Sequence, residues 1–171
     1  MMKIDIDELQ NFIESQSETT RIYFGADSER VNVNDVWMVD YLLVVAIHID
    51  GKHGAKVFGE VHREREYDKR LDRPKMRLMT EVMKVAELYL KCADFLEDRH
   101  VELHLDINPL EIHGSSCALN EAVGYIKGVC GIDPVVKPNS WAASICADRI
   151  KTILPTKLST TEVNHGRKES V

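Results

Sequence analysis

The fold class is decided by two stretches, VWMVDYLLVVAIHI at residues 36–49 and AKVFGEVH at residues 55–62, which are joined through an Asp-Gly dipeptide. Both stretches are rich in Val, Ile and aromatic residues, which favour β-strands. Asp-Gly is common in tight hairpin turns, because its residues tolerate the positive φ that such turns need. The sequence therefore predicts an antiparallel hairpin. The apolar run at residues 22–27 predicts a preceding strand that ends at Asp27, which completes an antiparallel meander.

Helices and strands alternate after the meander. Pro74 suits the first turn of a helix, and apolar residues recur at helical spacing from there to residue 97. The alternation of apolar and polar residues over 101–107 predicts a strand. Further patterns predict a helix capped by Ser115 or Ser116, a short strand at 135–136, and a helix over 141–153 capped by Ser140. The expected fold is therefore α/β, with a mixed five-stranded sheet (the meander, then parallel strands) and helices packed on it.

Length and composition indicate one domain. A chain of 171 residues with 44% hydrophobic residues can bury a single core. We expect a leading helix within residues 1–20, a domain over 21–155 and a flexible polar tail over 156–171. The longest apolar stretch is far shorter than the ~20 residues of a spanning helix, and the N-terminus lacks the apolar run of a signal peptide. The expected location is therefore cytoplasmic and away from membranes, and nothing in the sequence demands an oligomer.

The cysteines and the net charge exclude some classes of protein. The four cysteines form no Cys-x-x-Cys pair and do not cluster with histidine. The sequence therefore predicts neither disulfides nor a structural zinc site. The net charge of −6 argues mildly against a protein that coats nucleic acid by charge alone.

Two aspartates stand at or near the ends of predicted strands. Asp27 ends the first strand, and Asp106 lies at the end of the fourth. If these strands are parallel neighbours, both carboxylates project into one crevice, where they repel unless a cation or a proton intervenes. Oxygen ligands alone favour Mg²⁺ or Mn²⁺ over zinc. The alternative is structural, because Asp at a strand end often only begins a turn.

Two helical acids are further candidates. Glu81 borders the apolar stripe of the helix after Pro74, where it could lean over the crevice or simply be a solvated residue paired with Arg77 or Lys84. Asp148 lies in a helix of small residues, which suggests partial burial and hence a need for an ion or a basic partner. His104 shares a strand face with Asp106 and is expected to support it.

Basic residues gather in one segment, 63–77, where they outnumber acidic ones. A basic loop beside an acidic crevice would hold phosphates, although a solvated charged loop is the simpler interpretation. No phosphate-binding loop, dinucleotide fingerprint or nucleophile elbow is present.

Several motifs together resemble the YkuK family of predicted ribonuclease-H-like proteins. The resemblance spans roughly residues 22–153 and is carried by Gly25-Ala26-Asp27-Ser28, Arg77-Leu78-Met79-Thr80-Glu81-Val82, His104-Leu105-Asp106-Ile107-Asn108-Pro109, Gly124-Tyr125-Ile126-Lys127-Gly128, and Lys137-Pro138-Asn139-Ser140-Trp141-Ala142-Ala143 through Ala147-Asp148. It implies the ribonuclease H fold, with Asp27, Glu81, Asp106 and Asp148 as catalytic ligands of Mg²⁺ or Mn²⁺. The implied chemistry is phosphodiester hydrolysis by two metal ions.

The leading functional hypothesis is accordingly a metal-dependent nuclease acting on RNA, an RNA–DNA hybrid or structured DNA. The aromatic content of 6% gives no support for hybrid specificity. A second hypothesis is a non-catalytic module of the same fold that binds nucleic acid or a protein partner. A third, a nucleotide-hydrolysing enzyme, lacks the necessary glycine loop. The expected nucleic-acid contacts are Arg63, Arg65, Lys69, Arg70, Arg73, Lys127 and Lys137.

Overall fold

The antiparallel meander is present, and its first and third strands are longer than the sequence indicated. The computed structural model describes residues 3–153. Its meander consists of β1 (Arg21–Val33), β2 (Val36–His48) and β3 (Ala55–Arg65). The prediction that the first strand ends at Asp27 is wrong, because residues 28–33 continue to pair with β2. Asn34 and Asp35 form the turn of this ribbon with positive φ angles of 51° and 64°, a conformation that Asn and Asp tolerate better than most residues.

The sheet has four strands in the order β3-β2-β1-β4, with β4 (His100–His104) parallel to β1. The expected fifth strand is reduced to a single parallel bridge between His104 and Val135. Pro134 and Pro138 enclose this segment, and proline has no N–H for a strand ladder. Hydrogen bonds from Leu105 N to Val135 O (2.8 Å) and from Lys137 N to Ile107 O (3.0 Å) still hold the segment alongside the chain that follows β4.

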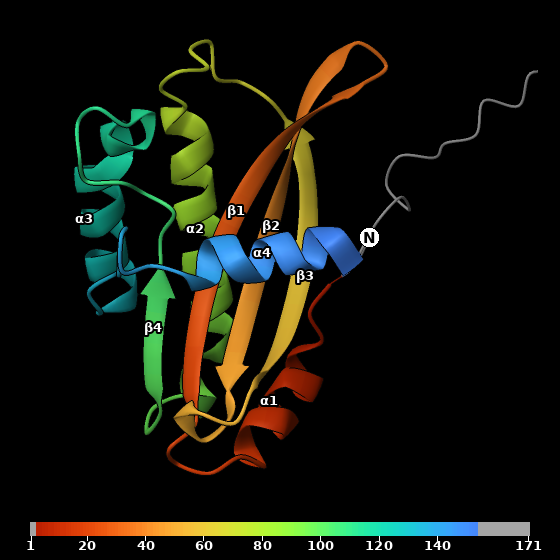
Figure 1. The fold of residues 1–171 in the computed structure, drawn as a ribbon, viewed down its shortest axis with the longest axis vertical. Helices are drawn as coiled ribbons and strands as arrows, with labels where there is room; N and C mark the ends of the chain where they lie inside the picture. Colours follow the sequence, from red (N-terminus) through yellow and green to blue (C-terminus); the bar gives the residue numbers. More distant parts are fainter. Residues whose placement is uncertain (1–2, 154–171) are drawn as a thin grey trace, which may run out of the picture.

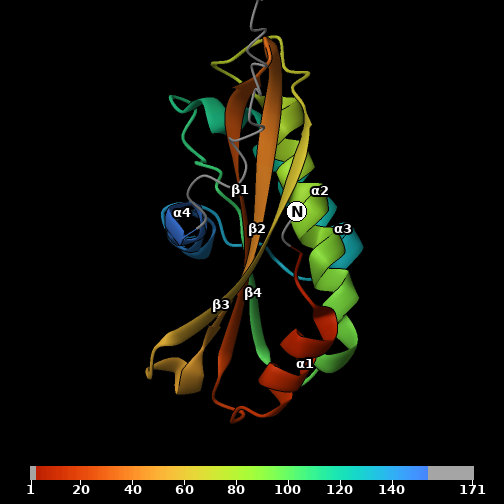
Figure 2. The same ribbon diagram turned by 90° about the vertical axis from the view of Figure 1, so that its right-hand side faces the viewer.

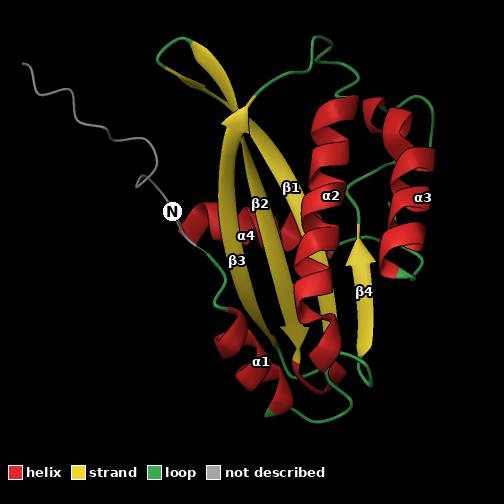
Figure 3. Cartoon of the chain, turned by 180° about the vertical axis from the view of Figure 1, so that it is seen from behind, coloured by secondary structure: helices red, strands yellow, loops and turns green. Residues whose placement is uncertain are grey.

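Helices cover both faces of the sheet. In Figure 2, α4 (Ala142–Ile153) lies on one side, and α2 (Lys75–Cys92) and α3 (Leu119–Cys130) lie on the other. The leading helix, α1 (Ile6–Glu14), packs Leu9 and Ile13 into the core beneath α2. Figure 3 shows α1, α2 and α3 in front of the sheet and α4 behind it. Short 3₁₀ segments complete the fold, namely η1 (Ile49–Gly51), η2 (Ala93–Phe95) and η3 (Gly114–Ala118).

The alternation of side chains along β1 divides the core in two. Ile22, Phe24 and Ala26 join the large cluster under α2 and α3, whereas Tyr23 belongs to a smaller cluster under α4. The helix predicted over residues 76–97 is shorter in the structure. The α-helix α2 ends at Cys92, and the 3₁₀ segment η2 follows it directly. No helix among the described residues has both the length and the apolar character needed to cross a bilayer.

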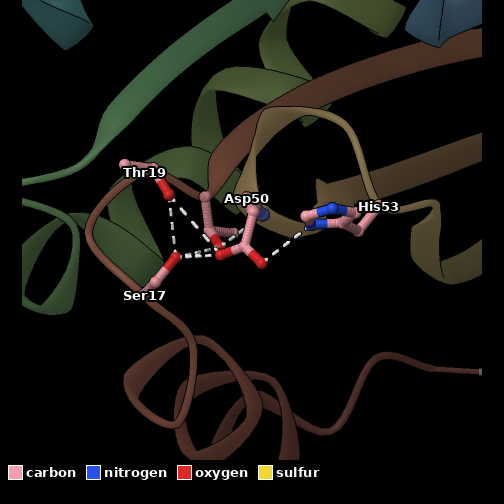
Figure 4. Close-up of polar contacts among 5 residues, drawn as sticks. Ser17, Thr19, Asp50 and His53 are labelled. Atoms are coloured by element: carbon pink, nitrogen blue, oxygen red, sulfur yellow. Dashed lines mark hydrogen bonds and ion pairs between the residues drawn. The ribbon is translucent and has the colours of Figure 1, made fainter.

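Asp50 connects the turn between β2 and β3 to the segment that precedes β1 (Figure 4). Its backbone has a φ of 55° in the turn between β2 and β3. Its carboxylate accepts hydrogen bonds from Ser17 and Thr19 of the α1–β1 connection and contacts His53 Nδ1 at 3.0 Å. The bonds from Ser17 and His53 hold the pKa of Asp50 below its usual value. Because the aspartate stands between the serine and the histidine, this cluster is not a nucleophilic triad, in which the histidine stands between the other two.

Helix α4 crosses the strands of the sheet (Figure 1) and approaches the backbone of β1 very closely. A Cβ atom at Gly25 of β1 would lie 2.7 Å from both Cα and N of Ala143. Gly59 of β3 is likewise covered by the side chain of Ile150. The helix therefore runs from β1 across to β3, and the glycine in β1 sets how closely it approaches the sheet.

We predict that Gly25→Ala lowers the free energy of unfolding by about 1–3 kcal/mol, because the added methyl group overpacks the contact with α4. Gly124→Ala is the matched control, since a Cβ there meets nothing within 4 Å and should stabilise α3 by about 0.5–1 kcal/mol. Denaturant unfolding of both variants measures the difference. Equal stability of Gly25→Ala and the wild type would contradict the close approach.

Candidate carboxylate site

The site begins where β1 and β4 stop pairing. Their last parallel pair is Gly25 with His104, so Asp27 and Asp106 each stand two residues beyond it on adjacent chains. The prediction that the first and fourth strands are parallel neighbours is confirmed. Side chains alternate along strands, so both aspartates share the face of His104, which packs against Trp141 with ring centroids 5.5 Å apart. That face is the one covered by α4.

Glu81 reaches this region from α2 on the opposite face. Its side chain is only 6% exposed, so the alternative of a solvated helix residue is wrong. The hydroxyl of Ser28 donates a hydrogen bond to Glu81 Oε1. Burial raises the pKa of Glu81 to about 8, with further upward contributions from the charges of Asp27 and Asp106. Three carboxyl groups from separate elements therefore act on one another electrostatically.

Arg77, one turn before Glu81 on α2, moderates this charge. Its guanidinium lowers the pKa of Glu81, although burial still dominates. The guanidinium also donates to the carbonyl of Ser28 at 3.3 Å. Arg77 and Ser28 thus tie α2 to the part of β1 that carries Asp27, a link that the sequence analysis missed because it joins residues far apart in the chain.

Asp106 is held by Lys137. The ammonium of Lys137 lies 2.5 Å from Asp106 Oδ1, and the two side chains are 39% and 23% exposed. Sequence analysis treated Lys137 as a nucleic-acid contact and did not anticipate this pair. The sequence signal for this pair was faint, because the two side chains are brought together by backbone contacts between residues 135–137 and residues 103–107, which are distant in the chain.

His104 caps α4, a role that the sequence analysis did not foresee. Its Nδ1 accepts hydrogen bonds from the backbone N–H groups of Trp141 and Ala142, both at 3.1 Å. Its Nε2 lies 2.8 Å from Glu102 Oε2, so the proton is on Nε2. Burial lowers the pKa of His104, which keeps the ring neutral and Nδ1 available as an acceptor. The expected cap, Ser140, is buried, but its hydroxyl makes no hydrogen bond among the described residues.

Asp148 stands apart from the other three acids. It lies on the exposed side of α4 in a shallow hollow with Ile145, Arg149 and Thr152, so the expected partial burial is wrong. The sheet-facing side of α4 carries Ala143 against β1 and Ile150 against β3. The role of Asp148 as a fourth ligand stays a prediction.

The donor set suits a hard divalent cation, although its present arrangement does not enclose one. Carboxylate oxygens are the ligands that Mg²⁺ and Mn²⁺ prefer, and Asp27, Glu81 and Asp106 supply three carboxylates. Within the described part of the chain, no three His, Cys, Asp or Glu side chains are placed close enough together to hold a metal ion. Asp106 is paired with Lys137, and Glu81 accepts from Ser28. Binding an ion therefore requires these side chains to exchange partners.

The predicted basic residues fall into two groups. Arg63, Arg70 and Lys127 are paired with Asp40, Asp72 and Asp133, as Lys137 is with Asp106. Arg65, Lys69 and Arg73 are exposed at the end of β3 and in the connection to α2. This connection is ordered by Asp68, whose carboxylate accepts from the N–H groups of Met76 and Arg77 at 3.2 and 2.7 Å. A structured loop thus presents these basic side chains to solvent.

We predict that Glu81→Gln stabilises the protein at alkaline pH in the absence of divalent ions. The folded state keeps Glu81 protonated up to about pH 8, against an ordinary pKa of 4.5, so the wild type loses stability as pH rises through that interval. The variant should exceed the wild type by roughly 1–3 kcal/mol at pH 8.5 and match it near pH 5. Denaturant unfolding in the presence of EDTA measures the free energy of unfolding of the variant and the wild type at each pH. Glu87→Gln on the same helix should show no such gain, because Glu87 is exposed and paired with Lys91 at 3.0 Å.

We predict that His104 makes stability fall in mild acid. Its pKa is lowered in the folded state, so the unfolded chain takes up a proton first as pH drops through about 6.5. His104→Gln should lose about 1 kcal/mol at pH 7.5 through the missing cap and show a shallower decline towards pH 5. Unfolding measured across this range tests the effect. His113→Gln, at an exposed position, is the control and should keep the wild-type slope. An unchanged slope in His104→Gln would refute the assignment.

Comparison with known proteins agrees with this architecture. A family model described as Ribonuclease H-like matches residues 5–152, a range that includes the meander, β4, and all four candidate acids. No curated protein and no solved structure matches the chain significantly. Because the family model covers most of the chain, the protein belongs to the ribonuclease H-like family, that of the YkuK proteins.

Proposed function

We propose that this protein is a divalent-metal-dependent nuclease that hydrolyses phosphodiester bonds of RNA or DNA. The observation that carries the proposal is the electrostatic coupling of Asp27, Glu81 and Asp106, which come from β1, α2 and the end of β4. A buried acid with a raised pKa, next to carboxylates at the carboxyl ends of two parallel strands, is typical of a functional site. Membership of the ribonuclease H-like family supports the same conclusion.

Asp27, Glu81 and Asp106 would hold Mg²⁺ or Mn²⁺, with Asp148 as a proposed fourth ligand. Bound divalent ions would supply an activated water and stabilise the leaving oxygen of the scissile phosphodiester. Without an ion, Glu81 holds a proton at neutral pH, which it would release on binding a cation. Ser28 orients its carboxyl group through Oε1. His104 fixes the start of α4 over the aspartates, which keeps the polar end of the sheet in place.

The exposed Arg65, Lys69 and Arg73 would bind the phosphate backbone of the substrate. Phosphate contacts position a nucleic acid without reading its sequence. The remaining predicted contacts, Arg63, Arg70, Lys127 and Lys137, would first have to leave their carboxylate partners. This division favours a substrate that approaches over the β3–α2 connection.

One observation favours the second candidate, a non-catalytic module that binds nucleic acid or a protein partner. Asp106 is already neutralised by Lys137, and Glu81 by a proton. A carboxylate set that is satisfied in this way is stable without any ion. The two candidates differ in whether the site binds a divalent cation at all.

We predict that Asp106→Asn weakens Mn²⁺ binding by at least about 10-fold, the smallest effect expected even for an outer-sphere partner, and abolishes cleavage. Calorimetric titration should be followed by a panel of single strands, duplexes, an RNA–DNA hybrid and a four-way junction. Asp133→Asn is the control, because Asp133 is also paired with a lysine, at 2.8 Å, but is 79% exposed. Folded wild-type protein that binds no Mn²⁺ would refute the nuclease and favour the non-catalytic module.

A further inference from the structure

We infer that Lys137 is an internal counter-ion of the carboxylate site, which occupies the cation position at Asp106 and sets the divalent-ion concentration at which the site fills. The inference rests on the proposed function, since it concerns the same acids. It concerns the competition between a resident ammonium group and a soluble ion. Three observations support it.

The first observation is the position of the ammonium group. Nζ of Lys137 lies 2.5 Å from Asp106 Oδ1, in a pair whose side chains are 39% and 23% exposed. The pair Lys75–Glu121 is equally short, at 2.5 Å, but its side chains are 47% and 58% exposed. The side chains of Lys91–Glu87 and Lys127–Asp133 are more than half exposed, so the lower exposure of Asp106 and Lys137 distinguishes their pair. A charge pair that is partly shielded from water interacts more strongly than one at the surface.

The second observation is the anchoring of the lysine backbone. The N–H of Lys137 donates to Ile107 O at 3.0 Å, directly next to Asp106. Val135 is bonded on both sides, through its N–H to Leu103 O and through its carbonyl to Leu105 N, both at 2.8 Å. The carbonyl of Val136 accepts from Asn139 and Ser140 at 3.0 and 3.1 Å. The ammonium group therefore extends from a fixed point of the backbone, and forming the pair has to order only the lysine side chain.

The third observation is the charge that Lys137 faces. Asp27 and Asp106 each stand two residues beyond the last parallel pair of adjacent chains. The buried Glu81 accepts a hydrogen bond from Ser28, the neighbour of Asp27, so acidic groups are concentrated here. Like charges in one site need protons or cations to coexist. For Asp106 that cation is the ammonium group of Lys137. A divalent ion that enters must break the lysine pair and also meets repulsion from the ammonium group.

Removing the charge of Lys137 should therefore tighten ion binding. We expect Lys137→Met to lower the apparent dissociation constant for Mn²⁺ at least about 5-fold, measured by calorimetry and by the loss of the free Mn²⁺ signal in electron paramagnetic resonance. Lys137→Arg keeps the charge and should bind Mn²⁺ within about 2-fold of the wild type. Lys91→Met, which breaks an exposed pair, is the matched control and should change nothing.

A thermal readout supplements the binding assay. Without divalent ions, Lys137→Met should melt below the wild type, because Asp106 loses its partner, and saturating Mn²⁺ should raise its melting temperature more than that of the wild type. Circular dichroism before each titration verifies that the variants are folded. If Lys137→Met proves unfolded, Lys137→Gln replaces it with the same expected direction.

The outcomes separate this inference from the proposed function. Wild-type Mn²⁺ binding that Lys137→Met leaves unchanged or weakens overturns the counter-ion and leaves the metal site standing. Binding by Lys137→Met but not by the wild type supports the counter-ion, because the lysine then blocks the site. Absence of binding in both folded proteins overturns the metal site, and the counter-ion with it. If an Asp106→Asn, Lys137→Met double variant still binds Mn²⁺ more tightly than the wild type, the inference is also overturned. The competition between the lysine and the ion must act through Asp106.

Discussion

The point at which β1 and β4 stop pairing governs the rest of the site. Up to Gly25 and His104 the two strands form a regular parallel ladder. Beyond it β1 stays with β2, whereas the chain after β4 bonds to the segment around Val135. Beyond this point the two chains no longer bond to each other. Asp27 and Asp106 occupy equivalent positions on the edges that face each other, two residues after the last pair. Glu81 can join them from the other face of the sheet because no strand ladder lies between.

The helix that covers this opening is held by backbone contacts at its start. Gly25 lets Ala143 approach β1 closely, and His104 accepts the first N–H groups of α4. An imidazole that caps a helix in this way must be neutral, and its burial ensures that it is. The start of α4 and the protonation state of the ring therefore depend on the same residue, His104, which shares its strand face with the two aspartates.

The site balances its negative charge without an ion in two different ways. Glu81 is neutralised by a proton because it is buried, whereas the more exposed Asp106 is neutralised by Lys137. Both arrangements are reversible, since a proton can leave and an ammonium group can swing into solvent. Under the proposed function, a divalent cation would displace both the proton and the ammonium group.

Local patterns determined much of this protein. The apolar runs and the Asp-Gly turn predicted the meander, the alternation over residues 101–107 placed Asp106 opposite the core, and the helical periodicities located α2, α3 and α4. These features follow from neighbours in the chain, which local sequence records. Only the tertiary structure decided that Glu81 is buried, that His104 rather than Ser140 caps α4, that Lys137 holds Asp106, and that Asp148 faces solvent. Each of these depends on which distant segment covers a side chain, and hence on desolvation and charge pairing across the fold, which no local pattern contains.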